Sequence, residues 1–309
     1  MRSERAAASL WGDLPFWYLW ISPFILLNLE VNNLGRPALP ALLSFLLPFG
    51  LVTVAFARTP GRRVRWTAYG VTSAALLVLV LGGLAGMRLE RVTLLRIFEA
   101  GGLGEFFLLA LHAARSGGRR VFALIFGVGL LYGLLLENAG VGMGFFSEHG
   151  YLVYLPLLPA PLCTSLGWCN VFYPLWWVVP RLAGPAARPA LQTLIATGLA
   201  LALDLQLDPV ATAAGFWVWH PELPPAFRGV PAVNFSAWAA AVLPFSWAVF
   251  RGPAPSEISP GRLLRDLPWV LGAALLLVLL LTAATEVRLG WPSLGIFARA
   301  ARHAVGWLS

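Results

Sequence analysis

Lysine is absent from this sequence of 309 residues, and histidine and cysteine are scarce, with four and two copies. Without lysine there is no Gly-Lys phosphate-binding loop, which argues against an ATP-driven pump of the P-loop type. No histidine lies three or four positions from another, which disfavours a membrane di-iron desaturase or hydroxylase. Cys163 and Cys169 are six positions apart and would point to different faces of a helix. We therefore expect two buried thiols, with neither a disulfide nor a metal site.

Charged residues are also few: they make up 12% of the chain, against about 25% in soluble domains. Hydrophobic residues make up 59%, which is too much apolar surface for one globular core to cover. Lipid must act as the solvent for much of this surface. The 14 tryptophans and 19 phenylalanines are typical of interfacial aromatic belts. The sequence thus predicts an all-α fold, a polytopic integral membrane helical bundle, with 1–309 as one transmembrane domain.

Nine apolar segments approach the roughly 20 residues that a membrane span needs. They are 14–29, 38–57, 66–87, 94–114, 120–138, 155–179, 189–208, 231–250 and 268–287. The first is short and the fourth contains Glu99 and Glu105, so we expect seven to nine transmembrane helices. Glu99 and Glu105 would face different ways, and we expect packing or interfacial roles for both. The tail 288–309 mixes aromatic residues with arginines and predicts an interfacial amphipathic helix.

The 22 basic residues are all arginine. Over nine spans, 14 of them fall on the side of the N-terminus and 8 on the other side. The positive-inside rule then predicts a cytoplasmic N-terminus in the inner (plasma) membrane, with segments 138–154 and 209–230 together on the non-cytoplasmic side. The arginines form short clusters between apolar runs, so we expect no nucleic-acid partner.

Two aspartates lie near the end of an apolar segment. Asp204 and Asp208 are four positions apart, so both carboxyl groups share one face of a helix. An ionisable residue at the centre of a span costs about 2.5–3.5 kcal/mol, so two on one face require a partner, a shared proton or water. Pro209 follows directly and predicts a break in the helix at membrane depth. The alternative is that both aspartates simply end a helix at the interface.

Glu137 ends another apolar run and precedes a stretch rich in glycine. It is either a site residue or an acid that faces a loop at a helix end. Aromatic residues are dense near the acids: Tyr151, Tyr154, Trp168, Tyr173, Trp176, Trp177, Trp217, Trp219 and Trp238. They form either an interfacial belt and core, or the lining of a long apolar slot whose ring faces can stabilise a developing cation.

At these residues the sequence resembles the membrane carotenoid-biosynthesis family that includes the hydratases of gamma-carotene and bisanhydrobacterioruberin. The matching stretches are Glu137 with the glycines after it, Gly150-Tyr151-Leu-Val-Tyr154, Pro161, Leu166-Gly167-Trp168, Asp204-Leu-Gln-Leu-Asp208-Pro209-Val-Ala, Trp217-Val-Trp219 and Arg228-Gly229-Val230-Pro231-Ala-Val-Asn234-Phe-Ser-Ala-Trp238. They cover about 100 residues inside a family-like core at about 120–250. Two positions depart from the pattern: Ala237, where a glycine is expected, and Arg228, where an aromatic residue is expected. Both are expected at the substrate slot, so they bear on substrate identity.

The resemblance implies hydration of the terminal isopropylidene double bond of an acyclic carotenoid end, which gives a tertiary alcohol. We expect Asp204, Asp208 and Glu137 to be catalytic, since buried neighbouring carboxyl groups can hold a proton for the alkene. The residues expected to bind substrate are Tyr151, Tyr154, Trp168, Trp217, Trp219, Asn234 and Trp238. No cofactor or metal is implied. The expected partners are a lipid-soluble carotenoid, membrane lipid and other enzymes of the carotenoid pathway.

Three alternatives remain open at this point. A prenyltransferase of the aromatic-prenyltransferase type also has an Asp-x-x-x-Asp motif, but it needs two acidic clusters to hold Mg²⁺ and a diphosphate, and one is found here. A lycopene-type cyclase also begins by protonating the end group, and its product keeps the mass of the substrate. A non-catalytic carotenoid-binding membrane protein would return its pigment unmodified.

Overall fold

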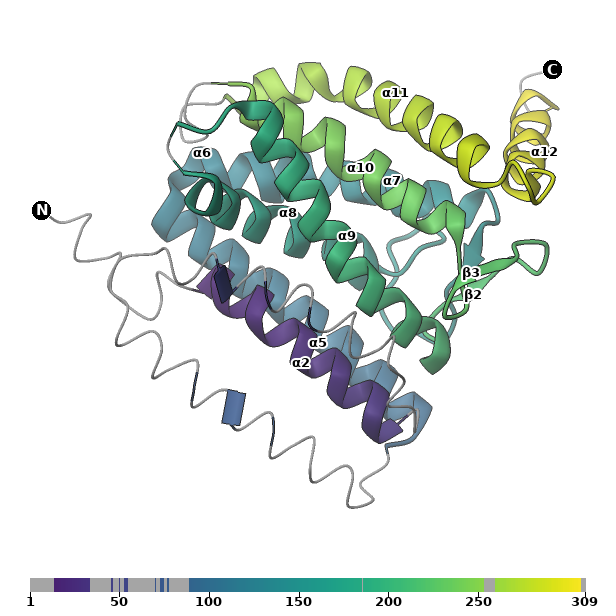
Figure 1. Cartoon of the computed structure of the whole chain (residues 1–309), viewed down its shortest axis with the longest axis horizontal. Coiled ribbons are helices and arrows are strands. Elements are labelled where there is room, and N and C mark those ends of the chain that lie inside the picture. Colours follow the sequence, from purple (N-terminus) through teal and green to yellow (C-terminus); the bar gives the residue numbers. More distant parts are fainter. Residues whose placement is uncertain are drawn as a thin grey trace, which may run out of the picture.

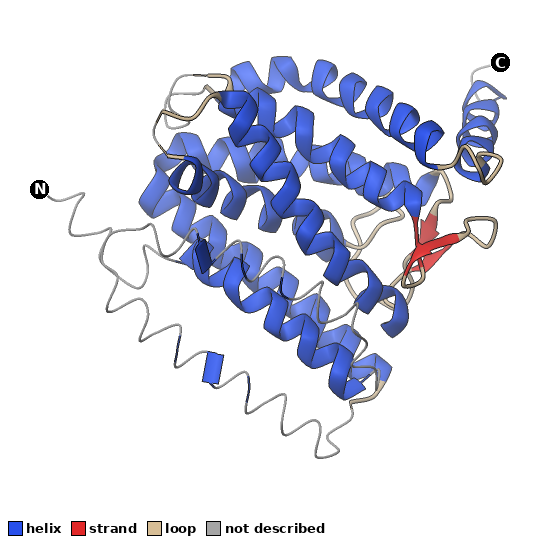
Figure 2. Cartoon of the chain, viewed as in Figure 1, coloured by secondary structure: helices blue, strands red, loops and turns tan. Residues whose placement is uncertain are grey.

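The described part of the chain is built almost entirely of helices (Figures 1 and 2). The computed structural model describes residues 14–33, 89–184, 186–252 and 259–306, with a few isolated positions between 46 and 77. The expected segments 38–57 and 66–87 lie outside these ranges. The longer helices are α2 (Leu14–Asn33), α5 (Arg91–His112), α7 (Leu130–Gly142), α8 (Leu162–Ala183), α9 (Pro189–Ala214), α10 (Ala232–Phe250), α11 (Pro260–Thr285) and α12 (Pro292–Gly306). The all-α prediction is confirmed for these residues.

The helical run from α5 to α7 contains a break. Three short elements join the two helices: η2 (Ala113–Gly117), α6 (Gly118–Phe122) and η3 (Ala123–Gly129). As one straight helix, the 52 residues of this run would measure about 78 Å, more than twice the hydrocarbon thickness of a membrane. Gly118 has φ 81° and ψ 173°, outside the helical region, so the chain changes direction there. In Figure 1, α6 lies at one end of the bundle and α7 runs back toward the other.

Four helical segments of the described residues are long and apolar enough to cross a membrane. They are the run Arg91–Gly142, α9, α10 and α11, judged by length and composition. The chain is thus a helical membrane protein, while the expected count of seven to nine spans is not confirmed. α8 begins at Leu162 and not at 155, because Pro156, Pro159 and Pro161 keep the preceding residues out of the helix.

The predicted helix break at Pro209 is wrong. α9 continues through Pro209 to Ala214 and ends at Gly215, which has a left-handed φ of 69°. A proline removes one N–H from a helix, and packing by neighbouring helices compensates for this inside membrane proteins. Here α9 packs against α2, α8 and α10. Asp208 therefore sits inside a continuous helix.

A close contact between α7 and α8 positions the centre of the bundle. A Cβ atom on Gly133 would lie 2.7 Å from the backbone oxygen of Ser165 and 2.8 Å from Cβ of Trp168, so only glycine fits. Next to this contact, Tyr132 stacks on Phe245 of α10 with ring centroids 5.2 Å apart. The close approach brings the indole of Trp168 to the helix face that carries Glu137, one turn after Gly133.

Two short sheets close one end of the bundle. β1 (Phe146–Ser147) pairs antiparallel with β2 (Val218–Trp219), and β3 (Pro225–Phe227) pairs with β4 (Val230–Pro231). The first pairing joins segments 138–154 and 209–230, which confirms that they lie at the same end. α12 packs there too, with the rings of Phe145 and Phe297 4.6 Å apart and Arg299 paired with Glu222 at 2.7 Å. The helix predicted in the tail is therefore confirmed, and its place at the membrane interface stays a prediction.

Candidate active site

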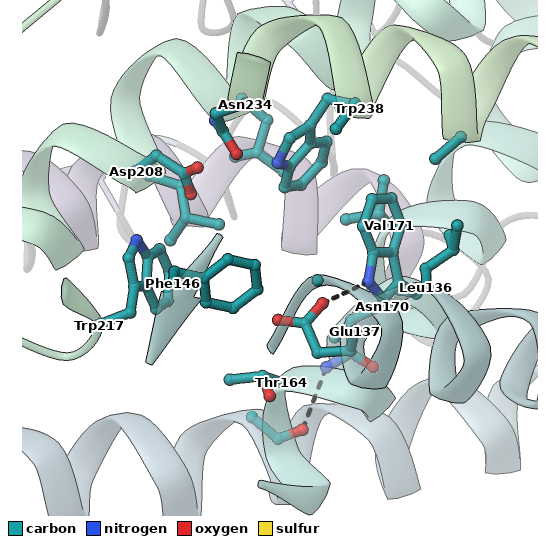
Figure 3. Close-up of a pocket in the computed structure, with 18 of the residues that line it drawn as sticks. Leu136, Glu137, Phe146, Thr164, Asn170, Val171, Asp208, Trp217, Asn234 and Trp238 are labelled. Atoms are coloured by element: carbon teal, nitrogen blue, oxygen red, sulfur yellow. Dashed lines mark hydrogen bonds between the residues drawn. The ribbon is translucent and has the colours of Figure 1, made fainter. Parts of the chain in front are cut away.

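A cavity of about 610 Å³ lies among α2, α5 and the helices from α7 to α12 (Figure 3). Apolar side chains form most of its wall. Its polar lining residues are Tyr18, Ser22, Glu105, Glu137, Thr164, Asn170, Asp208 and Asn234. Such a volume suits a sizeable apolar ligand with a few fixed polar groups around it.

The two aspartates of α9 form a buried pair at the cavity wall. Asp208 is 3% exposed and lines the cavity, whereas Asp204, one turn earlier, is fully buried behind it. The two carboxyl groups act on each other, and neighbouring buried carboxyl groups of this kind can share a proton. Nδ2 of Asn234 donates to both oxygens of Asp204, at 3.0 and 3.2 Å. The pair can therefore keep a proton at the edge of an apolar space.

Glu137 faces the same cavity from α7. Nε1 of Trp168 donates to its Oε2 at 2.8 Å. In Figure 3, Asp208 and Asn234 lie together, and Glu137 lies across the cavity from them. The charge of Glu137 also acts on Asp208, so the two groups lie within electrostatic reach. A small group bound between them would have a proton donor on one side and a base on the other.

Five of the seven residues expected to bind substrate line this cavity: Trp168, Trp217, Trp219, Asn234 and Trp238. The rings of Trp168 and Trp238 lie 4.9 Å apart. Tyr151 and Tyr154 do not line it. Tyr151 is buried in a cluster with Leu94 and Cys163, and the hydroxyl of Tyr154 donates to the backbone oxygen of Glu148 at 3.0 Å. Tyr151 thus lies behind the cavity wall, whereas Tyr154 is 38% exposed and lies at the surface.

Glu148 is a further buried acid at this end of the bundle. It follows β1, is 3% exposed, and accepts a hydrogen bond from the hydroxyl of Thr164 at 3.3 Å. Burial raises the pKa of the Glu148 carboxyl well above its ordinary value, and the charges of Glu137 and Asp208 raise it further. From the sequence it looks like an ordinary loop acid between two apolar segments.

Glu99 and Glu105 differ in role. Glu99 is buried and accepts the backbone N–H groups of Leu152 and Val153 at 2.9 and 2.8 Å, so it holds the loop that carries Glu148. This agrees with the expected packing role. Glu105 lines the cavity instead, together with Thr164, Asn170 and Phe146, none of which the sequence singled out. Their residue types are common in membrane helices and loops, so no sequence signal marks them.

Arg228 lies away from the substrate slot where it was expected. Its guanidinium forms an ion pair with the buried carboxylate of Glu30 on α2, and it does not line the cavity. That expectation is wrong because the ion pair with Glu30 holds the guanidinium away from the cavity. The sequence does not show this pair, since Glu30 is distant along the chain. Ala237, the other departure from the family pattern, does line the cavity. Cys163 and Cys169 are both buried and free, as predicted.

Comparison with known proteins identifies the family of the chain. The family described as "Carotenoid biosynthesis protein" matches residues 102–294, which is more than half of the chain and includes all three expected catalytic acids. Bisanhydrobacterioruberin hydratase of Haloarcula japonica is 31% identical over 179 residues, which are 54% of this chain and 57% of that protein. No solved structure matches the chain. Because the family model matches more than half of the chain, the chain belongs to the carotenoid biosynthesis protein family.

Proposed function

We propose that this protein is a carotenoid hydratase. It adds water to the terminal double bond of an acyclic carotenoid end and gives a tertiary alcohol, without a redox cofactor or metal. The observation that supports this best is the buried pair of aspartates, Asp204 and Asp208, at the wall of an apolar cavity, with Glu137 across from it. The activity named for the Haloarcula japonica relative is of the same kind.

In the proposed reaction, Asp208 gives its proton to the CH carbon of the terminal double bond, and the positive charge develops on the dimethyl carbon. Indole faces such as those of Trp168 and Trp238 stabilise this tertiary cation. A water molecule adds to the cation while Glu137 takes one of its protons. Asp204 does not contact the substrate. With Asn234 it holds the proton on Asp208 between turnovers.

The cavity also offers a route for a lipid-soluble substrate. Its lining includes Leu135 of α7 and Leu275 of α11, which are 43% and 52% exposed. Ala237 and Ala240 of α10 also line it. The lining thus reaches from the buried acids to exposed apolar side chains on α7 and α11. We propose that the polyene enters here from the membrane.

Filling this route is expected to slow the enzyme. Ala274 lines the cavity on α11 and is 6% exposed, so Ala274→Phe should lower the apparent kcat/KM by about tenfold, equal to about 1.4 kcal/mol. The matched control is Leu276→Phe, two positions away on an exposed face outside the cavity, which should stay within about twofold of the parent protein. Rates are measured in lipid nanodiscs. Equal rates for both variants would place the entry route elsewhere.

Expression in a bacterium that makes an acyclic carotenoid tests the function itself. A hydratase raises the pigment mass by one water for each reacted end. A product of unchanged mass with a new ring would show a cyclase, which would use the same proton donor. Unmodified bound pigment would show a carotenoid-binding protein. A requirement for magnesium and a prenyl diphosphate would show a prenyltransferase.

A further inference from the structure

After each turnover of the proposed reaction, the proton that Asp208 needs for the next cycle is on Glu137. Asp208 has lost its proton to the substrate, and Glu137 has gained one from water. Because hydration consumes no net proton, the proton must return from Glu137 to Asp208 before the next cycle. Among the residues that the structure describes, no hydrogen bond joins these two side chains, so the return needs a carrier.

Glu148 has the position of such a carrier. Besides burial, the carboxyl groups of Glu137 and Asp208 raise the pKa of the Glu148 carboxyl. Its Oε2 accepts the hydroxyl of Thr164, a residue of the cavity wall, while Glu148 itself lies behind that wall. Its other oxygen, Oε1, is buried and has no hydrogen-bond partner. That oxygen is available to give or take a proton.

The surroundings of Glu148 favour its neutral form. Within the described ranges no arginine or histidine forms an ion pair with it, and the ionisable groups that face it are Glu137, Asp208, Tyr151, Tyr154 and Cys163. None of these is a cation. Burial beside acids raises the pKa of the Glu148 carboxyl, which favours its protonated form.

We propose that Glu148 is the proton carrier that resets the site, which rests on the proposed function. After the chemical step, neutral Glu148 gives its proton to the Asp208 carboxylate and then receives the proton that Glu137 took from water. The hydroxyl of Thr164 lies 3.3 Å from Oε2 of Glu148 and 3.0 Å from the backbone oxygen of Pro161, and it connects Glu148 with the cavity when its hydrogen points to Glu148. The cycle then balances: one water is consumed, and all three carboxyl groups return to their starting states.

Single-turnover and steady-state rates distinguish this role from others. Glu148→Gln keeps the size and the hydrogen bond from Thr164 but cannot carry a proton. We expect the first turnover to stay within about twofold of the parent protein and the steady-state rate to fall by about tenfold or more, so that a burst of one product per enzyme appears. Glu148→Asp should recover part of the steady-state rate. The matched control is Glu222→Gln, an exposed acid at the same end.

The outcomes separate the two proposals. If the parent protein makes no hydrated product, the proposed function fails. If it does, an unchanged steady-state rate in Glu148→Gln overturns the carrier role, and so does an equal fall in both phases, which would show a structural or direct chemical role. If Glu148→Gln does not fold, Thr164→Val provides the test, because it removes the connecting hydroxyl and keeps the shape. A Thr164→Val protein without a burst overturns the proposal as well.

Discussion

Replacing Asp208 by asparagine is expected to lower the rate of hydration by about 10³-fold, because general acids contribute about 10²- to 10⁴-fold. Asparagine has the shape of aspartic acid, and its amide can still hydrogen-bond to Asp204, so the helix and the cavity should persist. What is lost is the transferable proton beside the double bond. The measurement is the rate of product formation in nanodiscs, with unfolding temperature and carotenoid binding as controls for the fold.

Asp204→Asn is the matched variant for this experiment. Asp204 is fully buried and does not line the cavity, so its loss should lower the rate by a smaller factor, about 10- to 100-fold, through weaker control of the proton on Asp208. If Asp208→Asn keeps more than half of the parental rate, the acid assigned here is wrong. If Asp204→Asn has the larger effect, the two aspartates exchange roles.

The second large effect is expected for Glu137→Gln, at about 10²-fold. Glutamine can still accept the hydrogen bond from Trp168, but it cannot take a proton from water. Protonation by Asp208 remains possible, so the cation should form and return to the alkene more often than it captures water. In D₂O, the unreacted carotenoid recovered from this variant should therefore carry deuterium at the protonated carbon, as mass spectrometry can detect.

Trp168→Phe serves as the comparison for Glu137→Gln. It removes the indole N–H that orients Glu137 but keeps an aromatic ring at the cavity wall. We expect a loss of about tenfold and no increase in deuterium in the recovered substrate. If the Glu137→Gln protein loses activity and its recovered carotenoid carries no deuterium, Glu137 acts in the protonation step and not in the addition of water.

The sequence predicts much of this architecture from simple rules. Apolar runs of membrane length lie where the described helices are found, and a spacing of four residues places Asp204 and Asp208 on one face. The spacing does not reveal that only Asp208 reaches the cavity. That difference depends on the packing of α9 against α10, which provides Asn234 as the partner of Asp204.

The sequence misleads where a distant residue decides the outcome. Pro209 follows the local rule for a helix break, yet packing by neighbouring helices keeps α9 continuous. Arg228 does not line the substrate cavity, because it forms an ion pair with Glu30, which lies near the start of the sequence. Glu148 is buried because Glu99 of α5 holds the next part of its loop through backbone N–H groups. None of these contacts can be derived from local propensity.

The pairing of β1 with β2 has a consequence for biosynthesis. β1 leaves the ribosome before α8 and α9, whereas β2 follows them. The two strands can therefore pair only after α9, which carries Asp208, has been synthesised. A chain that stops short of Trp219 therefore carries both Glu137 and Asp208 but lacks part of the strand that pairs with β1.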